Sequence, residues 1–164
     1  MSEKIITLLA DSFWKILLPG ITATIPLTII SFALALIIAT VTALVQFARV
    51  PVLTPLARFY IWIIRGTPLL VQLFVIFFGL PRIGVVLEPF PAAIIVFAVN
   101  TGAYDAETVR AALESVPRGQ LEAGECAGMT YWQTMRRIVL LQAMRTAFPS
   151  LSNSLISLVK DTSL

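Results

Sequence analysis

The sequence contains no histidine, one cysteine and little charge, since only 13% of its residues are Asp, Glu, Lys or Arg. Without histidine there is no imidazole to act as a general base or as a metal ligand. The single cysteine, Cys126, excludes an intrachain disulfide bond and a cysteine metal cluster. There is also no Gly-x-x-x-x-Gly-Lys-Ser/Thr loop to hold phosphates and no serine in a nucleophile elbow. We therefore expect that the chain is not an enzyme, does not hydrolyse ATP itself, and needs no cofactor or metal.

Apolar residues are abundant: they make up 58% of the 164 residues and give a mean hydropathy of +0.91. This composition is too apolar for a soluble domain and indicates an integral membrane protein. The net charge of +3 comes from basic residues spread along the chain, and no basic run with interleaved aromatic residues is present. We therefore expect membrane lipid around the chain and no nucleic acid as a partner.

The first membrane span is predicted over residues 21–47, because no charged residue occurs between Lys15 and Arg49. As a helix this segment would extend ~40 Å, more than the ~30 Å hydrocarbon core of a bilayer. The preceding residues 1–18 mix charged with apolar side chains and predict an amphipathic helix that lies in the membrane interface. Residues 19–164 are expected to form one transmembrane domain.

The second span is predicted over residues 59–81 and contains Arg65-Gly66-Thr67-Pro68 in its first third. Pro68 removes a backbone donor and crowds the carbonyl group of Ile64, so the helix either kinks or restarts there. A helix that restarts at Pro68 would cover only ~20 Å, which is short for a membrane crossing. We therefore favour one kinked span.

The third span, residues 92–110, carries three polar residues on one helix face, namely Asn100, Tyr104 and Glu107. Glu107 falls near the boundary of the hydrocarbon and can pair with Arg110 one turn later. Alternatively, all three residues line a path across the membrane, because polar groups inside a bilayer must find partners or water. The sequence leaves both interpretations open.

The fourth span, residues 143–159, is rich in small and hydroxylated residues, which allow helices to approach closely. It is therefore expected in the interior of the bundle. Lys160 and Asp161 end this span, either as a solvated helix terminus or as a further part of the polar path.

Between the third and fourth spans lies a polar insert, residues 115–142. Pro117 suits the first position of a helix, and Gly128 suits the residue just beyond a helix end. Thr130 and Gln133 have the spacing of a capping box, which would start a second helix. The insert is therefore predicted to be helix, glycine turn, helix.

Basic residues in short connections predict the orientation. Arg49 and Arg58 lie in the first connection and only Arg82 in the second. Five arginines surround the third: Arg110, Arg118, Arg136, Arg137 and Arg145. The positive-inside rule therefore places the first and third connections, and with them the insert, in the cytoplasm, and the amino terminus outside.

The insert also resembles a known motif. The motif consists of Glu122-Ala123-Gly124, three further residues, Gly128, nine further residues and then Ile138-x-Leu140. It is similar to the cytoplasmic coupling loop of the permeases of ABC importers. It differs from the usual pattern in having Gly124 in place of Ala and Leu141 in place of Pro. The resemblance extends from about residue 20 to the end and carries further segments typical of the polar amino-acid uptake branch: Arg65-Gly66-Thr67-Pro68-Leu69, Asn100-Thr101, Ala106-Glu107-Thr108 and residues 157–164.

The resemblance implies an all-α, polytopic bundle of the type I importer permease fold in a bacterial inner membrane. It implies that Glu122, Ala123, Gly124 and Gly128 couple the chain to a separate ATPase dimer, with small residues allowing close docking. It further implies a second permease subunit, identical or related, a periplasmic or lipid-anchored substrate-binding protein, and a polar amino acid such as cystine, glutamine, arginine or histidine as substrate. Asn100, Tyr104, Glu107, Lys160 and Asp161 are the candidate path residues.

Four spans are one fewer than this family usually has, so the last family span is expected to be missing and the chain to be a shortened permease. Two alternatives remain at this point. One is a secondary transporter or channel that uses Asp105, Glu107, Lys160 and Asp161 as an ion relay. The other is a nonfunctional permease fragment.

Overall fold

The computed structural model describes residues 12–15, 17–18 and 20–162. These residues form helices and connecting loops, and no strand occurs among them, so the all-α class is confirmed. The longer helices are α2 (Ile25–Phe47), α3 (Leu53–Arg65), α5 (Pro89–Glu114), α6 (Arg118–Cys126) and α8 (Leu140–Asp161). The shorter ones are η1 (Gly20–Thr24), α4 (Leu69–Phe74), η2 (Val75–Gly79), η3 (Leu80–Ile83), α7 (Tyr131–Thr134) and η4 (Met135–Val139).

The predicted amphipathic helix over residues 1–18 lies mostly outside the described residues. The described residues 12–15 and 17–18 are helical and lead into η1 and α2. η1 begins at Gly20, and the helical stretch Ser12–Phe47 extends further toward the amino terminus, so the start of the first span near residue 20 stays a prediction.

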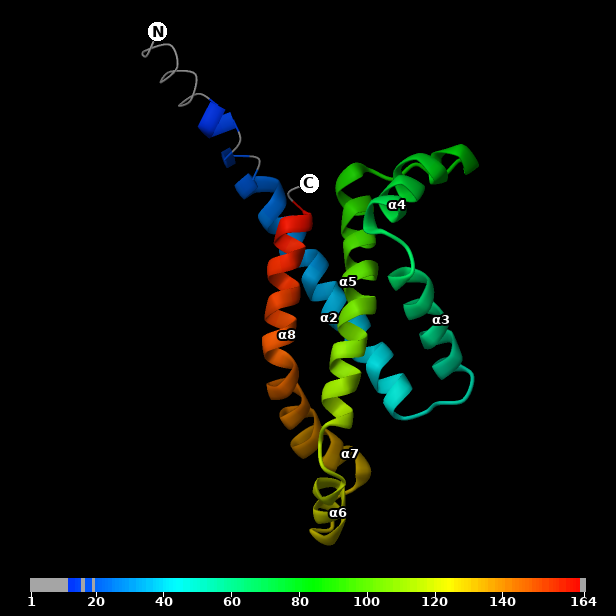
Figure 1. Ribbon diagram of the computed structural model, residues 1–164, viewed down its shortest axis with the longest axis vertical. Helices are drawn as coiled ribbons and strands as arrows, with labels where there is room; N and C mark the ends of the chain where they lie inside the picture. Colours follow the sequence, from blue (N-terminus) through cyan, green and yellow to red (C-terminus); the bar gives the residue numbers. More distant parts are fainter. Residues whose placement is uncertain (1–11, 16, 19, 163–164) are drawn as a thin grey trace.

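The long helices run up and down along one axis (Figure 1). α2 and α5 run in the same direction, while α3 and α8 return in the opposite one. The turn between α2 and α3 therefore lies at the same end of the bundle as α6 and α7, as the predicted topology requires. At the other end, the last turn of α8 reaches the first turn of α2, where the hydroxyl groups of Thr28 and Thr162 lie 2.8 Å apart in a hydrogen bond.

Helices α2 and α5 form the most extensive contact between elements, and small residues make it possible. The buried residues of α2 recur every three or four positions: Thr28, Ser31, Ala35, Ala39, Ala43 and Gln46. On α5, a Cβ atom added to Gly102 would lie 3.0 Å from the Ile38 Cγ2 and 3.3 Å from the Ala35 carbonyl oxygen. Small residues at the contact allow two helix backbones to approach closely, which is how helices associate where water does not drive burial.

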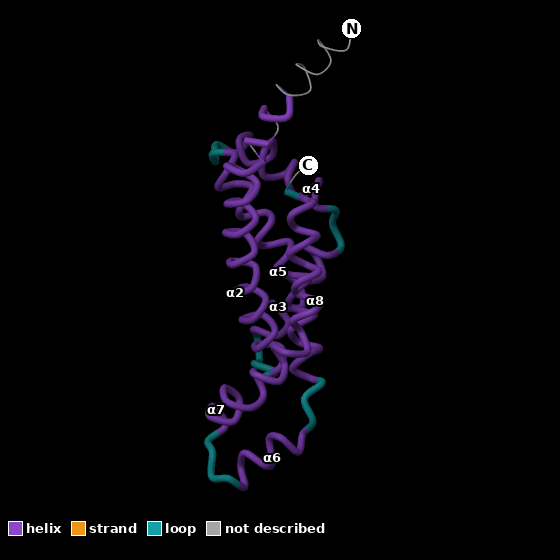
Figure 2. The backbone as a smooth tube through the Cα atoms, turned by 90° about the vertical axis from the view of Figure 1, so that its left-hand side faces the viewer, coloured by secondary structure: helices purple, strands orange, loops and turns teal. Residues whose placement is uncertain are grey.

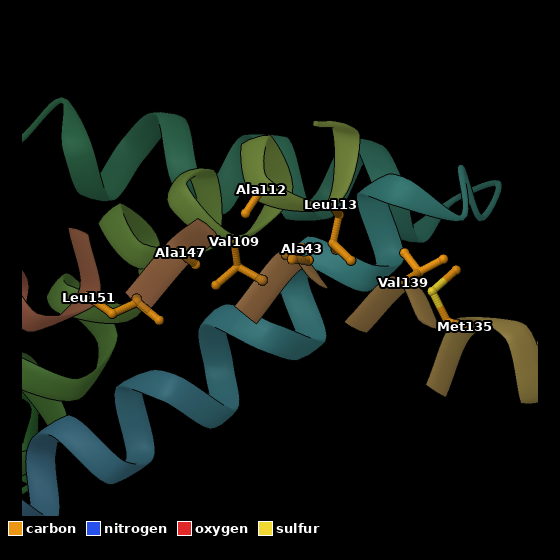
Figure 3. Close-up of a cluster of buried hydrophobic side chains, with 9 residues drawn as sticks. Ala43, Val109, Ala112, Leu113, Met135, Val139, Ala147 and Leu151 are labelled. Atoms are coloured by element: carbon orange, nitrogen blue, oxygen red, sulfur yellow. The ribbon is translucent and has the colours of Figure 1, made fainter. Parts of the chain in front are cut away.

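The largest apolar core lies toward the end that carries the insert (Figure 3). Four elements contribute to it: Ala43 from α2; Val109, Ala112 and Leu113 from α5; Met135 and Val139 from η4; and Ala143, Ala147 and Leu151 from α8. Because η4 belongs to the insert and shares this core with α2 and α5, the insert makes apolar contacts with the bundle and is not joined to it by its two ends alone.

Many large apolar side chains face outward, as expected for a surface against lipid. Among the described residues, the helical stretch Ser12–Phe47 is long and apolar enough to cross a membrane, and a second crossing results if the bent pair Leu53–Arg65 and Leu69–Ile83 counts as one span. α5 and α8 are long enough but do not meet the same test, since polar residues interrupt both. The count of four spans stays a prediction.

The second span differs from the kinked helix that we favoured. α3 ends at Arg65, the chain restarts as α4 at Leu69, and the two segments are bent by 99° at the break. Gly66 and Pro68 account for the break between the two helices. At Gly66 the chain passes so close to the Trp62 carbonyl oxygen that an added Cβ atom would lie 2.8 Å from it. Pro68 adopts an extended conformation with ψ of 141°, which ends the helical path before α4 begins. The restart that the sequence allowed as an alternative is therefore the observed geometry.

The expectation that the fourth span lies in the interior is met on one face of α8 only and otherwise stays a prediction. α8 packs on α5 and α2 through a single stripe of buried residues, Ala143, Ala147, Leu151 and Leu158. Its opposite face is exposed, with Phe148 at 68% and Ile156 at 54%. The described residues therefore leave this face of α8 uncovered.

Candidate functional site

Three of the five candidate path residues meet at one pocket of about 370 Å³ between the start of α4, the middle of α5 and the end of α8. We call it the polar pocket. It is lined by Thr67, Pro68, Leu69, Asn100, Thr101, Tyr104, Ser154, Ser157, Leu158 and Asp161. Asn100 and Tyr104 reach it from α5 and Asp161 from α8, so residues far apart in the sequence share one cavity.

The other two candidates, Glu107 and Lys160, do not line the polar pocket. Glu107 lies two turns further along α5 toward the insert, where its carboxylate forms an ion pair of 2.8 Å with Arg110. Arg110 also contacts Glu114 at 2.8 Å, so the three residues form a continuous ladder on the helix surface. This is the pairing that the sequence offered as the simpler interpretation of Glu107. Lys160 is exposed.

Arg65 stands beside the polar pocket. Its guanidinium carbon lies 5.1 Å from the centre of the Tyr104 ring, within the range of a cation–π interaction. The interaction joins the end of α3 to the middle of α5. The Tyr104 ring in turn lines the pocket.

Gln72 on α4 stabilises the broken segment next to the pocket, and the sequence reasoning missed it. Its side-chain amide donates hydrogen bonds to the carbonyl oxygens of Ile64 at 2.9 Å and Thr67 at 3.1 Å, and lies 2.8 Å from the Thr67 hydroxyl. Its own carbonyl oxygen accepts from the Asn100 amide at 3.1 Å. Asn100 therefore both lines the pocket and holds Gln72. The signal was present in the sequence as the lone amide in the apolar run 69–79.

Asp105 lies on a different face of α5 from Asn100, and its side chain is only 2% exposed. The Asp105 Oδ2 atom has no hydrogen-bond partner among the described residues. Asp105 shares its helix face with Ala98, Gly102 and Ala112, which are all buried.

The insert has the predicted helix, turn, helix arrangement (Figure 2). Pro117 precedes α6 rather than occupying its first position, and the Gln120 N–H donates to the Pro117 carbonyl oxygen at 2.9 Å. Gly128 has φ of 72°, a conformation that glycine adopts without steric cost. The Met129 N–H donates to the Gly124 carbonyl at 3.0 Å and the Gly128 N–H to the Glu125 carbonyl at 2.9 Å, which is a complete Schellman motif.

The second helix of the insert starts as predicted. The Thr130 hydroxyl accepts from the Gln133 N–H at 3.4 Å, and the Gln133 side chain accepts from the Thr130 N–H at 2.9 Å. This reciprocal capping box fixes the start of α7. The two caps together define the angle between α6 and α7.

The four residues expected to couple the chain are arranged on two faces of α6 and its turn. Glu122, Ala123 and Gly128 are exposed and available to a partner, whereas Gly124 is the only buried residue of α6. An added Cβ on Gly124 would lie 2.5 Å from the Thr134 Cγ2 and 3.0 Å from its Cβ. The small size of Gly124 therefore serves the packing of α6 against α7 within the insert. This differs from the expectation that it serves docking to a partner.

Comparison with known proteins decides what kind of bundle this is. Residues 35–164 match the family described as binding-protein-dependent transport system inner membrane component. The chain belongs to this permease family. Among its relatives, the L-cystine transport system permease protein TcyB of Bacillus subtilis is 52% identical over 157 residues, which are 96% of this chain and 67% of that protein. The probable amino-acid ABC transporter permease protein YckA of the same organism is 39% identical and is covered to 70%.

Comparison with a solved structure also supports the fold of a permease of this family. The crystal structure of an amino acid ABC transporter with histidines superposes with a TM-score of 0.83 at 33% identity, covering 94% of this chain and 72% of that one. The permease is thus a membrane transport subunit of the ABC importer class with the type I fold. This membership excludes the alternative of a secondary transporter or channel.

Proposed function

We propose that this permease carries polar amino acids in an ATP-driven importer, that the polar pocket is part of its translocation path, and that the insert receives movement from a separate ATPase dimer. The observation that carries the proposal is the convergence of Asn100, Tyr104 and Asp161 on one pocket. The printed roles of the relatives, transport of L-cystine and of amino acids, support the substrate class.

The chemistry of the polar pocket fits an amino acid, which carries an ammonium and a carboxylate group. The Asp161 carboxylate is suited to accept from the ammonium group. The hydroxyl groups of Ser154 and Ser157 line the same pocket and are suited to donate to the carboxylate. The volume of about 370 Å³ is within the range of small-molecule sites, roughly 300–1,000 Å³.

The insert supplies the proposed contact for the ATPase. Glu122 and Ala123 are exposed on α6, and the caps at Gly128 and Thr130 hold α6 at a fixed angle to α7. A rigid, exposed helix at the end of the bundle is what a docking element requires. The remaining partners are a second permease subunit, identical or related, and a periplasmic or lipid-anchored binding protein, all at a bacterial inner membrane.

The proposal is tested by uptake in proteoliposomes that contain the permease with its ATPase and binding protein. Asp161→Asn removes the charge that would bind the ammonium group, and we expect uptake of labelled cystine, glutamine, arginine or histidine to fall at least ~10-fold. Glu88→Gln is the matched control, because Glu88 is exposed at the start of α5 and does not line the pocket. Equal uptake by both variants for every amino acid would refute the role of the polar pocket.

A further inference from the structure

A second polar cavity, of about 380 Å³, lies at the insert end of the bundle, between the end of α2, the start of α3 and the end of α5. We call it the arginine pocket. It is lined by Gln46, Arg49, Arg58, Glu107, Arg110 and Glu114. It shares no lining residue with the polar pocket and has no part in the proposed translocation path.

The charges around this pocket leave a positive excess. Arg110 is held by Glu107 and Glu114, each at 2.8 Å, so these three residues together carry one negative charge. Arg49 and Arg58 form no ion pair with any described residue. Two guanidinium groups therefore face the cavity without a carboxylate of their own, and the six lining residues sum to one positive charge.

A buried donor adds to these two cations. Gln46 is 8% exposed, and its side chain faces the Glu107 carboxylate, but its Nε2 atom forms no hydrogen bond of good geometry among the described residues. A buried amide without a partner costs free energy unless a ligand or water satisfies it. Two guanidinium groups and one amide are the donors that bind the oxygen atoms of a phosphate group.

The loop that presents Arg49 has an unusual backbone. Arg49 has φ of 51° and Val52 has φ of 67°, and they are the only non-glycine residues with positive φ among the described ones. For a β-branched residue such as Val52 this conformation is an outlier. Strained backbone of this kind clusters at functional sites, where the surrounding structure maintains it.

The position of the pocket indicates that the phosphate belongs to a lipid. No charged residue occurs in α2 before Arg49, so the pocket lies where the apolar part of the helix ends. Next to it, the outer face of α3 exposes Leu56 at 58%, Phe59 at 58% and Trp62 at 71%. The acyl chains of a lipid can lie along this apolar face while the headgroup enters the pocket. A soluble phosphate has no apolar part that could contact the face.

We propose that the arginine pocket binds the phosphate headgroup of an anionic phospholipid, with Arg49 and Arg58 contacting the phosphate and Gln46 donating to it. Basic pockets between membrane helices on the cytoplasmic side are suited to such headgroups. The bound lipid would hold the turn between α2 and α3 against the end of α5. This site lies beside the insert but is independent of the substrate proposed above.

The test uses the full chain, purified in detergent, delipidated, and titrated with phosphatidylglycerol in native mass spectrometry. Phosphatidylcholine, which has the same phosphate but no net charge, is the reference lipid. The Arg49→Gln/Arg58→Gln variant should weaken phosphatidylglycerol binding about 25-fold, because each basic side chain is worth roughly fivefold in affinity for an anionic lipid. Arg82→Gln/Arg145→Gln removes the same charge from exposed residues outside the pocket and should bind within about twofold of wild type.

Two further measurements keep the test decisive. Arg49→Lys/Arg58→Lys retains the charge but loses the planar guanidinium groups, so its affinity for phosphatidylglycerol should lie between those of the wild type and the Gln variant. Circular dichroism checks that the Gln variant is folded. Inorganic phosphate at millimolar concentration should not displace the lipid. Displacement by phosphate, equal binding of both lipids, or equal losses in the two double Gln variants would each overturn the proposal.

Discussion

The side chain of Thr134 occupies the space that a Cβ atom on Gly124 would need. Gly124 lies in α6 and Thr134 in α7, and Thr134 is 2% exposed with a hydroxyl that has no partner among the described residues. The two residues therefore fit as a pair, with the absent side chain of one accommodating the other. Any larger residue at position 124 would require Thr134 to move.

Gly124→Ala is expected to destabilise the insert. The added methyl group would overlap Thr134 and force α6 away from α7, at a cost of about 1–3 kcal/mol. Thermal unfolding of the purified chain measures the loss of stability. Coupled ATP hydrolysis in the reconstituted importer measures its effect on function.

Two variants separate this effect from a general effect of alanine. Gly119→Ala lies in the same helix with nothing within 4 Å of its Cβ, so it should be neutral or slightly stabilising. Gly124→Ala/Thr134→Ala removes the atoms that collide and should recover most of the stability. If the double variant is no more stable than Gly124→Ala alone, the pairing is not the cause.

Gln72→Leu is expected to loosen the break between α3 and α4. The carbonyl groups of Ile64 and Thr67 would lose their amide donor in an apolar environment, at about 1–3 kcal/mol for each group left unsatisfied. Thermal unfolding in detergent should show a clearly lower midpoint. Gln142→Leu, which removes one side-chain bond to Gln120, is the control and should cost about 1 kcal/mol. Equal midpoints for the two variants would contradict the role of Gln72.

Glu107→Gln and Asp161→Asn should differ in substrate transport although both remove a carboxylate from a candidate path residue. Glu107 is paired with Arg110 outside the polar pocket, whereas Asp161 lines it. The Glu107 variant should keep KM for substrate within about twofold of wild type, while the Asp161 variant should raise KM or abolish uptake. A strong rise of KM in Glu107→Gln would place substrate near the arginine pocket instead.

Cys126 offers a test of orientation without any added label site. It is exposed at the end of α6 and is the only cysteine of the chain. If the insert is cytoplasmic, a membrane-impermeant maleimide should modify Cys126 in permeabilised cells but not in intact ones. Cys126→Ser should abolish the signal in both cases. Labelling in intact cells would reverse the orientation and remove the insert from the side where ATP is available.

The local chemistry of the insert could be predicted well from the sequence. Thr130, Gln133 and Gly128 act through backbone groups at most five residues away, so their caps depend on local spacing and not on tertiary structure. The face shared by Asn100 and Tyr104 was likewise given by helical periodicity. The convergence of that face with Asp161 could not be predicted, because it depends on how α5 and α8 pack.

The geometry of the second span was predicted incorrectly for a physical reason. Pro68 alone is compatible with a kink or with a restart, and the choice depends on whether the freed carbonyl groups find other donors. Gln72 donates to both carbonyl groups, and Asn100, which is 28 residues away in the sequence, holds Gln72 by donating to its side-chain oxygen. Such a distant hydrogen bond leaves no periodic signal in the sequence.

The helix that begins at Tyr131 in the insert continues through η4 and α8 to Asp161 without interruption. At 1.5 Å per residue it is roughly 45 Å long, so a tilt of about 5° at one end displaces the other by about 4 Å. The π-helical segment η4 and Pro149 are places within it where it can bend. If α7 moves, the movement can therefore reach Asp161 in the polar pocket along one continuous helix, to the extent that η4 and Pro149 do not bend.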